Sequence, residues 1–302
     1  MTSAPTSHTS PTVTTAPTAA TRADALVAAI AAKGAPVCVG LDPTLEQMPA
    51  SLRRDDPCAS IELFTRGVLD AVAPAVPAVK FQSACFERFG WRGVRVLEAC
   101  ISQARGLGLV VVLDFKRGDI GISSSHYAAA AASAGAHFVT VSGYLGLSGV
   151  EPFLAADLGA FVLVRTSNPD SSAVQSEKLA AGPTVAEHMA ALVKTLGEKH
   201  RGTTGLSAVG AVVGATQSRE AGALRALMPD QLFLIPGYGA QGGTADDIRT
   251  MRRASQPSEK SGVLVTASRS VIYAKASEGQ HWLDAVGHAA KNLAREIRDV
   301  VA

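Results

Sequence analysis

Short apolar segments recur along the chain, and each is followed by a stretch with a helical pattern. The segments are almost continuously apolar, as in Gly-Leu-Val-Val-Val-Leu at 108–113, which is typical of parallel strands covered on both faces. Between them, apolar residues recur three and four positions apart, for instance Val94, Leu97 and Ile101, and indicate helices. The predicted strands are 36–41, 77–81, 109–113, 137–141, 160–164, 208–213, 231–235 and 262–266.

The alternation of these strands with helices predicts a parallel α/β fold. A (β/α)8 TIM barrel typically takes about 250 residues, and it fits the single domain that we expect at residues 23–302. A doubly wound open sheet is the alternative. The long segment 168–207, with a helix expected at about 185–199, is either a lid over a site or a peripheral insertion.

Residues 1–22 differ in composition from the rest of the chain. They consist almost entirely of Ser, Thr, Pro and Ala, and they lack the apolar block of a signal peptide. A transit peptide would carry several arginines, whereas Arg22 is the only arginine in this segment. We therefore expect a disordered tail whose deletion leaves activity intact.

Composition and charge narrow the class of protein. The 302 residues are 47% hydrophobic and 18% charged, which excludes disorder of the whole chain. The formal charge of +2 and the lack of a basic stripe with interleaved aromatic residues argue against nucleic acid as a partner. No apolar run approaches the roughly 20 residues of a membrane-spanning helix, so we expect a cytoplasmic protein. The 4 cysteines lack zinc-site spacing and are expected to be reduced.

The carboxyl ends of the predicted strands carry the candidate chemistry, and a barrel would bring them to one face. Within LDFKRGDI at 113–120, Asp114 and Lys116 follow a buried strand and should point to the same side. Burial of a lysine beside a carboxylate is costly unless the two are paired, so the pair is either a structural salt bridge or a catalytic device. Asp119, three residues further on, favours catalysis. Other polar strand ends carry Asp42, Lys80 and Ser167.

A glycine-rich loop, PGYGAQGG at 236–243, follows the seventh predicted strand and precedes a helix expected from about Thr244. Exposed backbone N–H groups and a helix N-terminus bind anions. Arg269, after the eighth strand, would lie beside this loop and could make bidentate bonds to a phosphate. The two strand ends together predict a phosphate site, which is its usual position in such barrels.

Six segments in order resemble those of orotidine 5′-phosphate decarboxylase, most closely those of the longer-chain bacterial members of the family. The similarity covers about residues 35–275. Asp-x-Lys-x-x-Asp alone is shared with a few related barrels, but the other five segments make the resemblance specific. The segments are VGLD at 39–42, VKF at 79–81, LDFKRGDIG at 113–121, RTSNPD at 165–170, PGYGAQGG at 236–243 and SRS at 268–270.

The resemblance implies conversion of orotidine 5′-monophosphate to UMP and CO2 in de novo pyrimidine biosynthesis, without a metal or an organic cofactor. Loss of CO2 from C6 leaves an electron pair that the ring cannot delocalise. A fixed ammonium beside C6 can stabilise this pair and then protonate it. The family assigns that role to the lysine matching Lys116, with Asp114 and Asp119 keeping it charged and in place. Lys80 completes an alternating array of charges.

The resemblance also implies contacts to the substrate. Asp42 and Lys80 match residues that bind ribose hydroxyls. Ser167 matches the residue that hydrogen-bonds the pyrimidine, and Gln241 matches the one that bridges phosphate and base. Ser123 stands where many members have a threonine that contacts ribose across a dimer interface. The other groups expected to bind substrate, chiefly its phosphate, belong to Arg269, Gly239, Gly242 and Gly243.

In the family, the second aspartate of the motif reaches the site from the neighbouring subunit, so the resemblance implies a homodimer with Asp119 supplied in trans.

The sequence leaves three rival functions. Related barrels use Mg²⁺ to form an enediolate from a sugar phosphate, but Lys80 would repel the metal ion. A Schiff-base aldolase would need a neutral lysine, whereas Lys116 beside two carboxylates should stay protonated. The third is a catalytically silent nucleotide-binding module. The histidines lack ligand spacing, and no metal site is expected.

Overall fold

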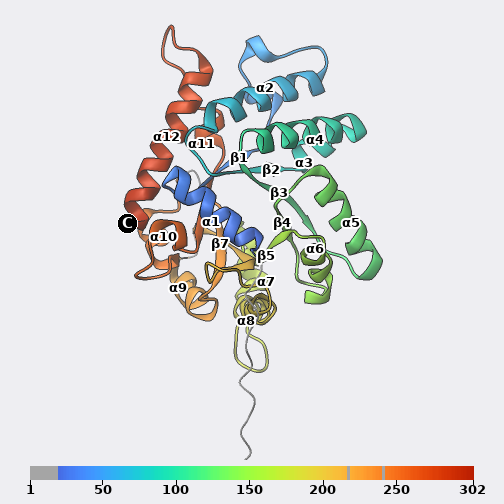
Figure 1. The fold of residues 1–302 in the computed structure, drawn as a ribbon, viewed down its shortest axis with the longest axis vertical. Helices are drawn as coiled ribbons and strands as arrows, with labels where there is room; N and C mark the ends of the chain where they lie inside the picture. Colours follow the sequence, from blue (N-terminus) through green and yellow to red (C-terminus); the bar gives the residue numbers. More distant parts are fainter. Residues whose placement is uncertain (1–19, 216–217, 240–241) are drawn as a thin grey trace, which may run out of the picture.

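The computed structural model describes residues 20–215, 218–239 and 242–302. Eight parallel strands form a closed barrel in which each strand pairs with the next and β8 pairs with β1 (Figure 1). The predicted (β/α)8 barrel is confirmed, and the open sheet is excluded. The strands are β1 (Val37–Leu41), β2 (Ala78–Gln82), β3 (Val110–Arg117), β4 (Phe138–Val141), β5 (Gly159–Arg165), β6 (Ser207–Val213), β7 (Gln231–Ile235) and β8 (Val263–Ala267).

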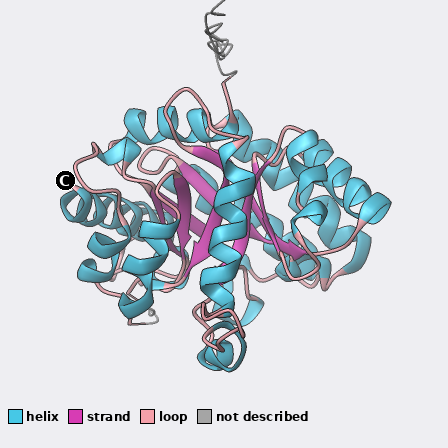
Figure 2. Cartoon of the chain, turned by 90° about the horizontal axis from the view of Figure 1, so that it is seen from below, coloured by secondary structure: helices cyan, strands magenta, loops and turns pink. Residues whose placement is uncertain are grey.

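Helices surround the strands on all sides (Figure 2). They are α1 (Arg22–Lys33), α2 (Pro57–Val72), α3 (Ala84–Glu87), α4 (Gly90–Gly106), α5 (Gly121–Ala134), α6 (Glu151–Ala155), α7 (Ser172–Gln175), α8 (Val185–Glu198), α9 (Ser218–Leu227), α10 (Ala245–Met251), α11 (Arg269–Ile272) and α12 (Trp282–Val301). Short 3-10 helices are η1 (Leu45–Gln47), η2 (Ala50–Leu52), η3 (Leu147–Gly149), η4 (Pro169–Ser171) and η6 (Ser258–Lys260).

The predicted strands agree with the observed ones to within one residue, with one exception. β3 continues to Arg117, whereas the apolar pattern predicted an end at Leu113. The extension exists because Arg117 still pairs with Val141 of β4, after an irregularity in register. Asp114 and Lys116 therefore lie on the strand itself, which fixes their positions better than a loop would.

The core has two layers. The larger layer lies between the barrel and the surrounding helices, and the smaller one fills the barrel. Inside the barrel, the rings of Phe138 and Phe161 stack with their centroids 5.1 Å apart. Leu26 and Ile30 of α1 join this inner cluster, so α1 covers one end of the barrel. The interior is a packed core rather than a channel, which leaves only the carboxyl ends of the strands for a site.

Helix α1 begins at Arg22, which the composition had placed in the tail. The Thr21 side chain and Asp24 form a capping box, and Arg22 makes a 2.7 Å ion pair with Asp157. The folded domain therefore begins about two residues before the predicted boundary, because Thr21 caps the helix. Residues 1–19, which make up most of the predicted tail, lie outside the described residues.

The segment between β5 and β6 contains η4, α7 and α8, and α8 matches the helix predicted at 185–199. Arg165, at the end of β5, is buried and anchors the first part of this segment. Its guanidinium donates to the hydroxyls of Ser171 and Ser172 and pairs with Glu220 of α9 at 2.7 Å. The lid and the peripheral insertion both stay predictions.

Two further properties concern the chain as a whole. Among the described residues, the helices are too short or too polar to cross a membrane. All four cysteines are free, and Cys38, Cys58 and Cys100 are buried. Burial raises the pKa of Cys38 and of Cys100 to about 12, so both thiols are protonated at neutral pH.

Candidate active site

A cavity of about 430 Å³ lies at the carboxyl ends of the strands. It brings together residues that are far apart in the sequence, as expected for a barrel. Five of the predicted site residues line it: Asp42, Lys80, Asp114, Lys116 and Ser167. Its other lining residues are Gln82, Thr140, Leu163, Thr166, Asn168, Gln175, Val212, Leu234 and Pro236.

The inward-facing positions of the strands explain why the charges gather here. Along β3, Val110 and Val112 belong to the inner apolar cluster, and Asp114 follows at the next inward position. Along β2, Ala78 is in the same cluster and Lys80 lines the cavity. Alternate residues of a strand face the same side, so each strand passes from apolar to polar on its inner face. A charged layer therefore lies on top of an apolar core.

Asp114 is held between two lysines. Its Oδ2 lies 2.7 Å from Lys80 Nζ, and its Oδ1 lies 2.5 Å from Lys116 Nζ. The Thr140 hydroxyl donates a third hydrogen bond to Oδ1 at 2.8 Å. Lys80 also lies 3.8 Å from Asp42 Oδ1, so the array reads Asp42, Lys80, Asp114, Lys116. Such a chain of alternating charges fixes each member by its neighbours.

Burial and charge act in opposite directions on this array. Burial tends to raise the pKa of Asp114, but Lys80 and Lys116 outweigh it and lower the value to about 2. Burial tends to lower the pKa of Lys80, but Asp114 and Asp42 raise it above its ordinary range. Asp114 is therefore ionised and Lys80 is charged at neutral pH, which makes the array a set of fixed charges.

Lys116 has an unusual backbone conformation for a residue other than glycine. Its φ angle is 45°, in the left-handed region, and its N–H donates to the Thr140 hydroxyl at 3.1 Å. Such strain persists only where surrounding contacts hold it, and it is frequent at functional sites. The side chain is 47% exposed, whereas the side chains of Lys80 and Asp114 are below 10%. Of the two lysines that line the cavity, Lys116 is the more accessible to a bound molecule.

Asp42 is positioned by contacts from the segment after β8, the strand that pairs with β1. Ser268, after β8, donates to Asp42 Oδ2 at 2.8 Å, and the Tyr273 hydroxyl donates to the Asp42 carbonyl at 3.3 Å. Gly40 allows the approach, because a Cβ there would lie only 2.9 Å from Ser268 Cβ. Asp42 Oδ1 is buried and accepts no hydrogen bond from the described residues. It is a free acceptor for a hydroxyl group in the cavity.

Asp119 and Ser123 lie outside the residues that line the cavity of their own chain. Asp119 is in the turn between β3 and α5, where its Oδ1 accepts from the Ile120 N–H at 2.8 Å. The Ser124 hydroxyl donates to the Asp119 carbonyl at 2.7 Å and secures the turn. Ser123 lies in the first turn of α5 and is half-buried. The structure of one chain therefore does not bring Asp119 to Lys116.

The glycine-rich loop differs from the sequence-based expectation. The N–H groups of Gly239, Gly242 and Gly243 donate to carbonyls within the loop, so they are not free for a phosphate. Helix α10 begins after Thr244 as predicted, but the Asp247 carboxylate already accepts from the Thr244 N–H. A carboxylate at this end competes with an anion, which the loop composition alone could not reveal.

Arg269 and Gln241 complete the predicted residues. Arg269 is the first residue of α11, directly after β8, and it is exposed at the carboxyl end of the barrel. Arg269 does not line the cavity, and its place beside the glycine-rich loop stays a prediction. Gln241 lies outside the described residues.

Sequence reasoning missed several polar residues at the site. Thr140 is the only polar residue in Phe138–Val141. The alternation of inward and outward positions along this strand could have predicted that Thr140 faces the cavity. Ser268 belongs to a quoted motif, yet its bond to Asp42 joins the two ends of the barrel sheet and depends on closure. Gln175 accepts from the Thr166 N–H at 2.8 Å, a contact within an irregular segment that no periodic pattern predicts.

Across residues 20–215, 218–239 and 242–302, no group of three or more His, Cys, Asp or Glu side chains is placed to hold a metal ion. The carboxylates of the cavity are instead neutralised by lysines.

The fold and the cavity together define a class, that of (β/α)8 barrels with a charged site at the carboxyl ends of the strands. Within this class, the profile of the orotidine 5′-phosphate decarboxylase / HUMPS family matches residues 35–281. The chain belongs to the orotidine 5′-phosphate decarboxylase family, as its motifs predicted.

Individual relatives agree with this assignment. The chain is 38% identical to orotidine 5′-phosphate decarboxylase of Rhodopirellula baltica, covering 90% of this chain and 97% of the relative. It is 41% identical to the protein of that name from Bordetella avium, covering 90% and 96%. Among solved structures, a putative orotidine 5′-phosphate decarboxylase from Streptomyces avermitilis is similar with a TM-score of 0.78 and 35% identity, covering 94% and 97%.

Proposed function

We propose that this chain decarboxylates orotidine 5′-monophosphate to UMP and CO2, with Lys116 as the proton donor. The observation that carries the proposal is the placement of Asp114 between Lys80 and Lys116, with Lys116 facing the cavity. Membership of the family supports the substrate, and it places the reaction in pyrimidine biosynthesis.

The chemistry follows from fixed charges. When the bond from C6 to the carboxylate breaks, CO2 leaves and the electron pair stays on C6. The Lys116 ammonium stabilises this pair and then transfers its proton to C6, which gives UMP and a neutral amine. Because the Lys116 side chain is 47% exposed, solvent can return the proton once the product leaves. Asp114 and Thr140 cost little reorganisation during this step, because they are already hydrogen-bonded in place.

Binding of the rest of the nucleotide uses the remaining polar residues. Asp42 Oδ1, a buried acceptor without a hydrogen bond, suits a ribose hydroxyl, and Lys80 lies beside it. Ser167 in the cavity wall suits the pyrimidine. We infer that Arg269 binds the phosphate, helped by Gln241 and by N–H groups of the glycine-rich loop. Three of those N–H groups would have to exchange their internal hydrogen bonds for phosphate, so we expect this loop to rearrange on binding.

We infer that the active form is a homodimer in which Asp119 and Ser123 act on the partner's substrate. Large apolar side chains gather near Asp119 and are exposed: Ile120 by 62%, Ile122 by 74%, Tyr144 by 85% and Leu145 by 52%. The β4–α6 segment reaches the Asp119 turn, because a Cβ on Gly149 would lie 2.4 Å from the Asp119 carbonyl oxygen. Exposed apolar patches of this kind mark protein interfaces. If a second chain buried this patch, Asp119 would lie next to that chain.

We also infer a metal-independent reaction in the cytoplasm. Lys80 occupies the strand end where a divalent cation would need a carboxylate, and its charge would repel the ion. Four free thiols are typical of a reducing compartment.

The test is the fall in ultraviolet absorbance of orotidine 5′-monophosphate in EDTA, measured for the wild type and for Lys116→Ala. We expect rapid turnover by the wild type and a loss of at least about 10³-fold in the variant, because both charge stabilisation and the proton donor are removed. Lys194→Ala is the matched control, since Lys194 pairs with Glu198 on the exposed face of α8.

Two further measurements, of sugar-phosphate turnover with Mg²⁺ and of UMP binding, separate the rivals. Turnover of a sugar phosphate only after Mg²⁺ is added would assign the chain to the metal-dependent barrels. Tight binding of UMP without any turnover would identify a silent nucleotide-binding protein. Either result would overturn the proposal.

A further inference from the structure

Arg117 follows Lys116 directly but lies on the opposite side of β3, outside the barrel. We propose that Arg117 is a positioning residue that holds Lys116 and the Asp119 turn in place from outside. The inference rests on the proposed decarboxylation, which supplies its readout.

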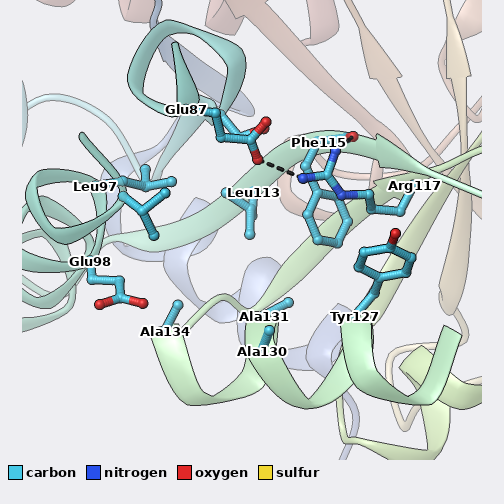
Figure 3. A pocket seen from close by; sticks show the side chains of 12 residues that line it. Glu87, Leu97, Glu98, Leu113, Phe115, Arg117, Tyr127, Ala130, Ala131 and Ala134 are labelled. Atoms are coloured by element: carbon cyan, nitrogen blue, oxygen red, sulfur yellow. Dashed lines mark hydrogen bonds and ion pairs between the residues drawn. The ribbon is translucent and has the colours of Figure 1, made fainter. Parts of the chain in front are cut away.

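Because side chains alternate along β3, the residues that face the substrate cavity and the residues that face outward lie on opposite sides of the strand. Asp114 and Lys116 face the substrate cavity, whereas Phe115 and Arg117 line a second cavity of about 260 Å³ between α4 and α5. Figure 3 shows this second cavity, with apolar residues on its floor and the Arg117 guanidinium at its edge. Arg117 therefore does not touch a molecule bound beside Lys116, and any effect on catalysis must act through the backbone.

The Arg117 side chain is held by contacts of different kinds. Its Nη2 lies 2.6 Å from Glu87 Oε1, and its Nη1 donates to the Phe115 carbonyl at 3.3 Å. The guanidinium also lies over two aromatic rings, 5.1 Å from the centroid of Phe115 and 5.5 Å from that of Tyr127. Figure 3 shows these groups around the guanidinium, with the bond to Glu87 dashed. A planar cation held by an ion pair and two rings has little freedom to move.

These contacts join the two strands that carry the lysines. Glu87 ends α3, the short helix that follows β2 and Lys80. The ion pair between Glu87 and Arg117 thus links β2 to β3 outside the barrel, while Lys80 and Asp114 link them inside. The Arg117 carbonyl also accepts from the Ser142 N–H at 2.8 Å, which ties the same residue to β4.

The backbone at this point needs such support. Lys116 has a φ angle of 45°, and the pairing of β3 with β4 is irregular between Leu113 and Arg117. A strained residue relaxes unless its neighbours hold it. If Arg117 were released, we expect the backbone of Lys116 to relax and its ammonium to move away from the reacting carbon.

A contribution to the stability of the fold does not explain the ion pair between Arg117 and Glu87 well. The side chains of Arg117 and Glu87 are 33% and 36% exposed, and ion pairs with such exposure add little to the free energy of unfolding. The buried Nε of Arg117 has no acceptor among the described residues, which is a cost. The arrangement is better explained by the geometry that it imposes than by the energy that it contributes.

The test compares Arg117→Met, Arg117→Lys and the wild type by kcat, KM, UMP affinity and melting temperature. Methionine keeps an apolar stem on the rings but loses the ion pair. We expect kcat of Arg117→Met to fall about 10- to 100-fold, as for a small misplacement of a catalytic group, while UMP affinity stays within about 3-fold. Arg117→Lys keeps the charge, so its kcat should lie between those of the wild type and Arg117→Met.

Two further variants make the test decisive. Glu87→Gln removes one charge of the pair with almost no change in shape, so it answers the question even if Arg117→Met does not fold. Arg66→Met is the control, since Arg66 pairs with Glu62 on α2 at similar exposure. An unchanged kcat in Arg117→Met and Glu87→Gln, or a parallel loss of kcat and UMP affinity, would overturn the inference. If the wild type itself fails to turn over orotidine 5′-monophosphate, the proposed function fails instead.

Discussion

Asp114 is the residue on which the charged array depends, because it contacts both lysines and Thr140. Thr140 carries no charge, yet it helps to position both Asp114 and Lys116. The Thr140 hydroxyl donates to Asp114 and accepts from the Lys116 N–H, so it connects the carboxylate to the strained backbone of the proton donor.

We predict that Thr140→Val lowers kcat/KM roughly 10-fold, the equivalent of about 1.4 kcal/mol for one hydrogen bond to a charged group. Valine has nearly the same shape, so the loss would report the hydroxyl. Thr140→Ser keeps the hydroxyl and should stay close to the wild type. Steady-state assays of both variants decide the matter, and equal activity of the valine and serine variants would refute the prediction.

At the scale of elements, one carboxylate of α1 makes several hydrogen bonds to a distant turn of the chain. Asp24 completes the capping box with Thr21, and it also accepts from the backbone N–H groups of Thr203 and Thr204 and from the Thr204 hydroxyl. Burial would raise the pKa of Asp24, but these hydrogen bonds outweigh it and lower the value to about 2. The helix that covers the inner core is thus joined to the turn before β6.

The shifted pKa predicts how stability depends on pH. Because the folded pKa of Asp24 is below its ordinary value, the ionised carboxylate stabilises the fold above about pH 4, and this contribution is lost as the pH falls toward 2. Asp24→Asn cannot titrate, so its melting temperature should fall less than that of the wild type between pH 4 and pH 2. Thermal melts across this range test the prediction.

The control for this experiment is Asp246→Asn, at an exposed position of α10. It should follow the wild-type curve. If Asp24→Asn also follows that curve, the hydrogen bonds of Asp24 do not lower its pKa in the folded protein.

At the scale of the whole molecule, the location of Asp119 outside its own cavity predicts complementation between chains. We expect Lys116→Ala and Asp119→Ala to be inactive alone but to recover activity after mixing and subunit exchange. In a mixed dimer, one site lacks both residues and the other has both. Random exchange should therefore restore about a quarter of wild-type activity, since half of the dimers are mixed and each has one intact site.

A matched mixture of Lys116→Ala with Asp114→Asn should recover nothing, because both residues come from the same chain at every site. No recovery in the first mixture, with dimers confirmed by sedimentation, would show that Asp119 does not act in trans.

The sequence by itself determined a parallel α/β fold and the strand ends that carry most of the charged site, whereas closure into a barrel, rather than an open sheet, was decided by the structure. Apolar strands of regular spacing can be covered on both faces only in a parallel α/β fold, and the polar residue after each strand marks the carboxyl end. Asp42, Lys80, Asp114 and Lys116 were found in this way, and the cavity contains all four. The shared location of these four residues could be predicted because it depends on local alternation, which a single strand shows on its own.

Only the tertiary structure decided how these residues contact one another. Three features depend on the pairing between strands. They are the extension of β3 to Arg117, the hydrogen bond from Thr140 to Asp114, and the ion pair between Arg117 and Glu87. The internal hydrogen bonds of the glycine-rich loop depend on its folded path, which composition does not specify. Contacts of this kind follow from the register of neighbouring strands and the closure of the barrel, and no single segment of the sequence contains that information.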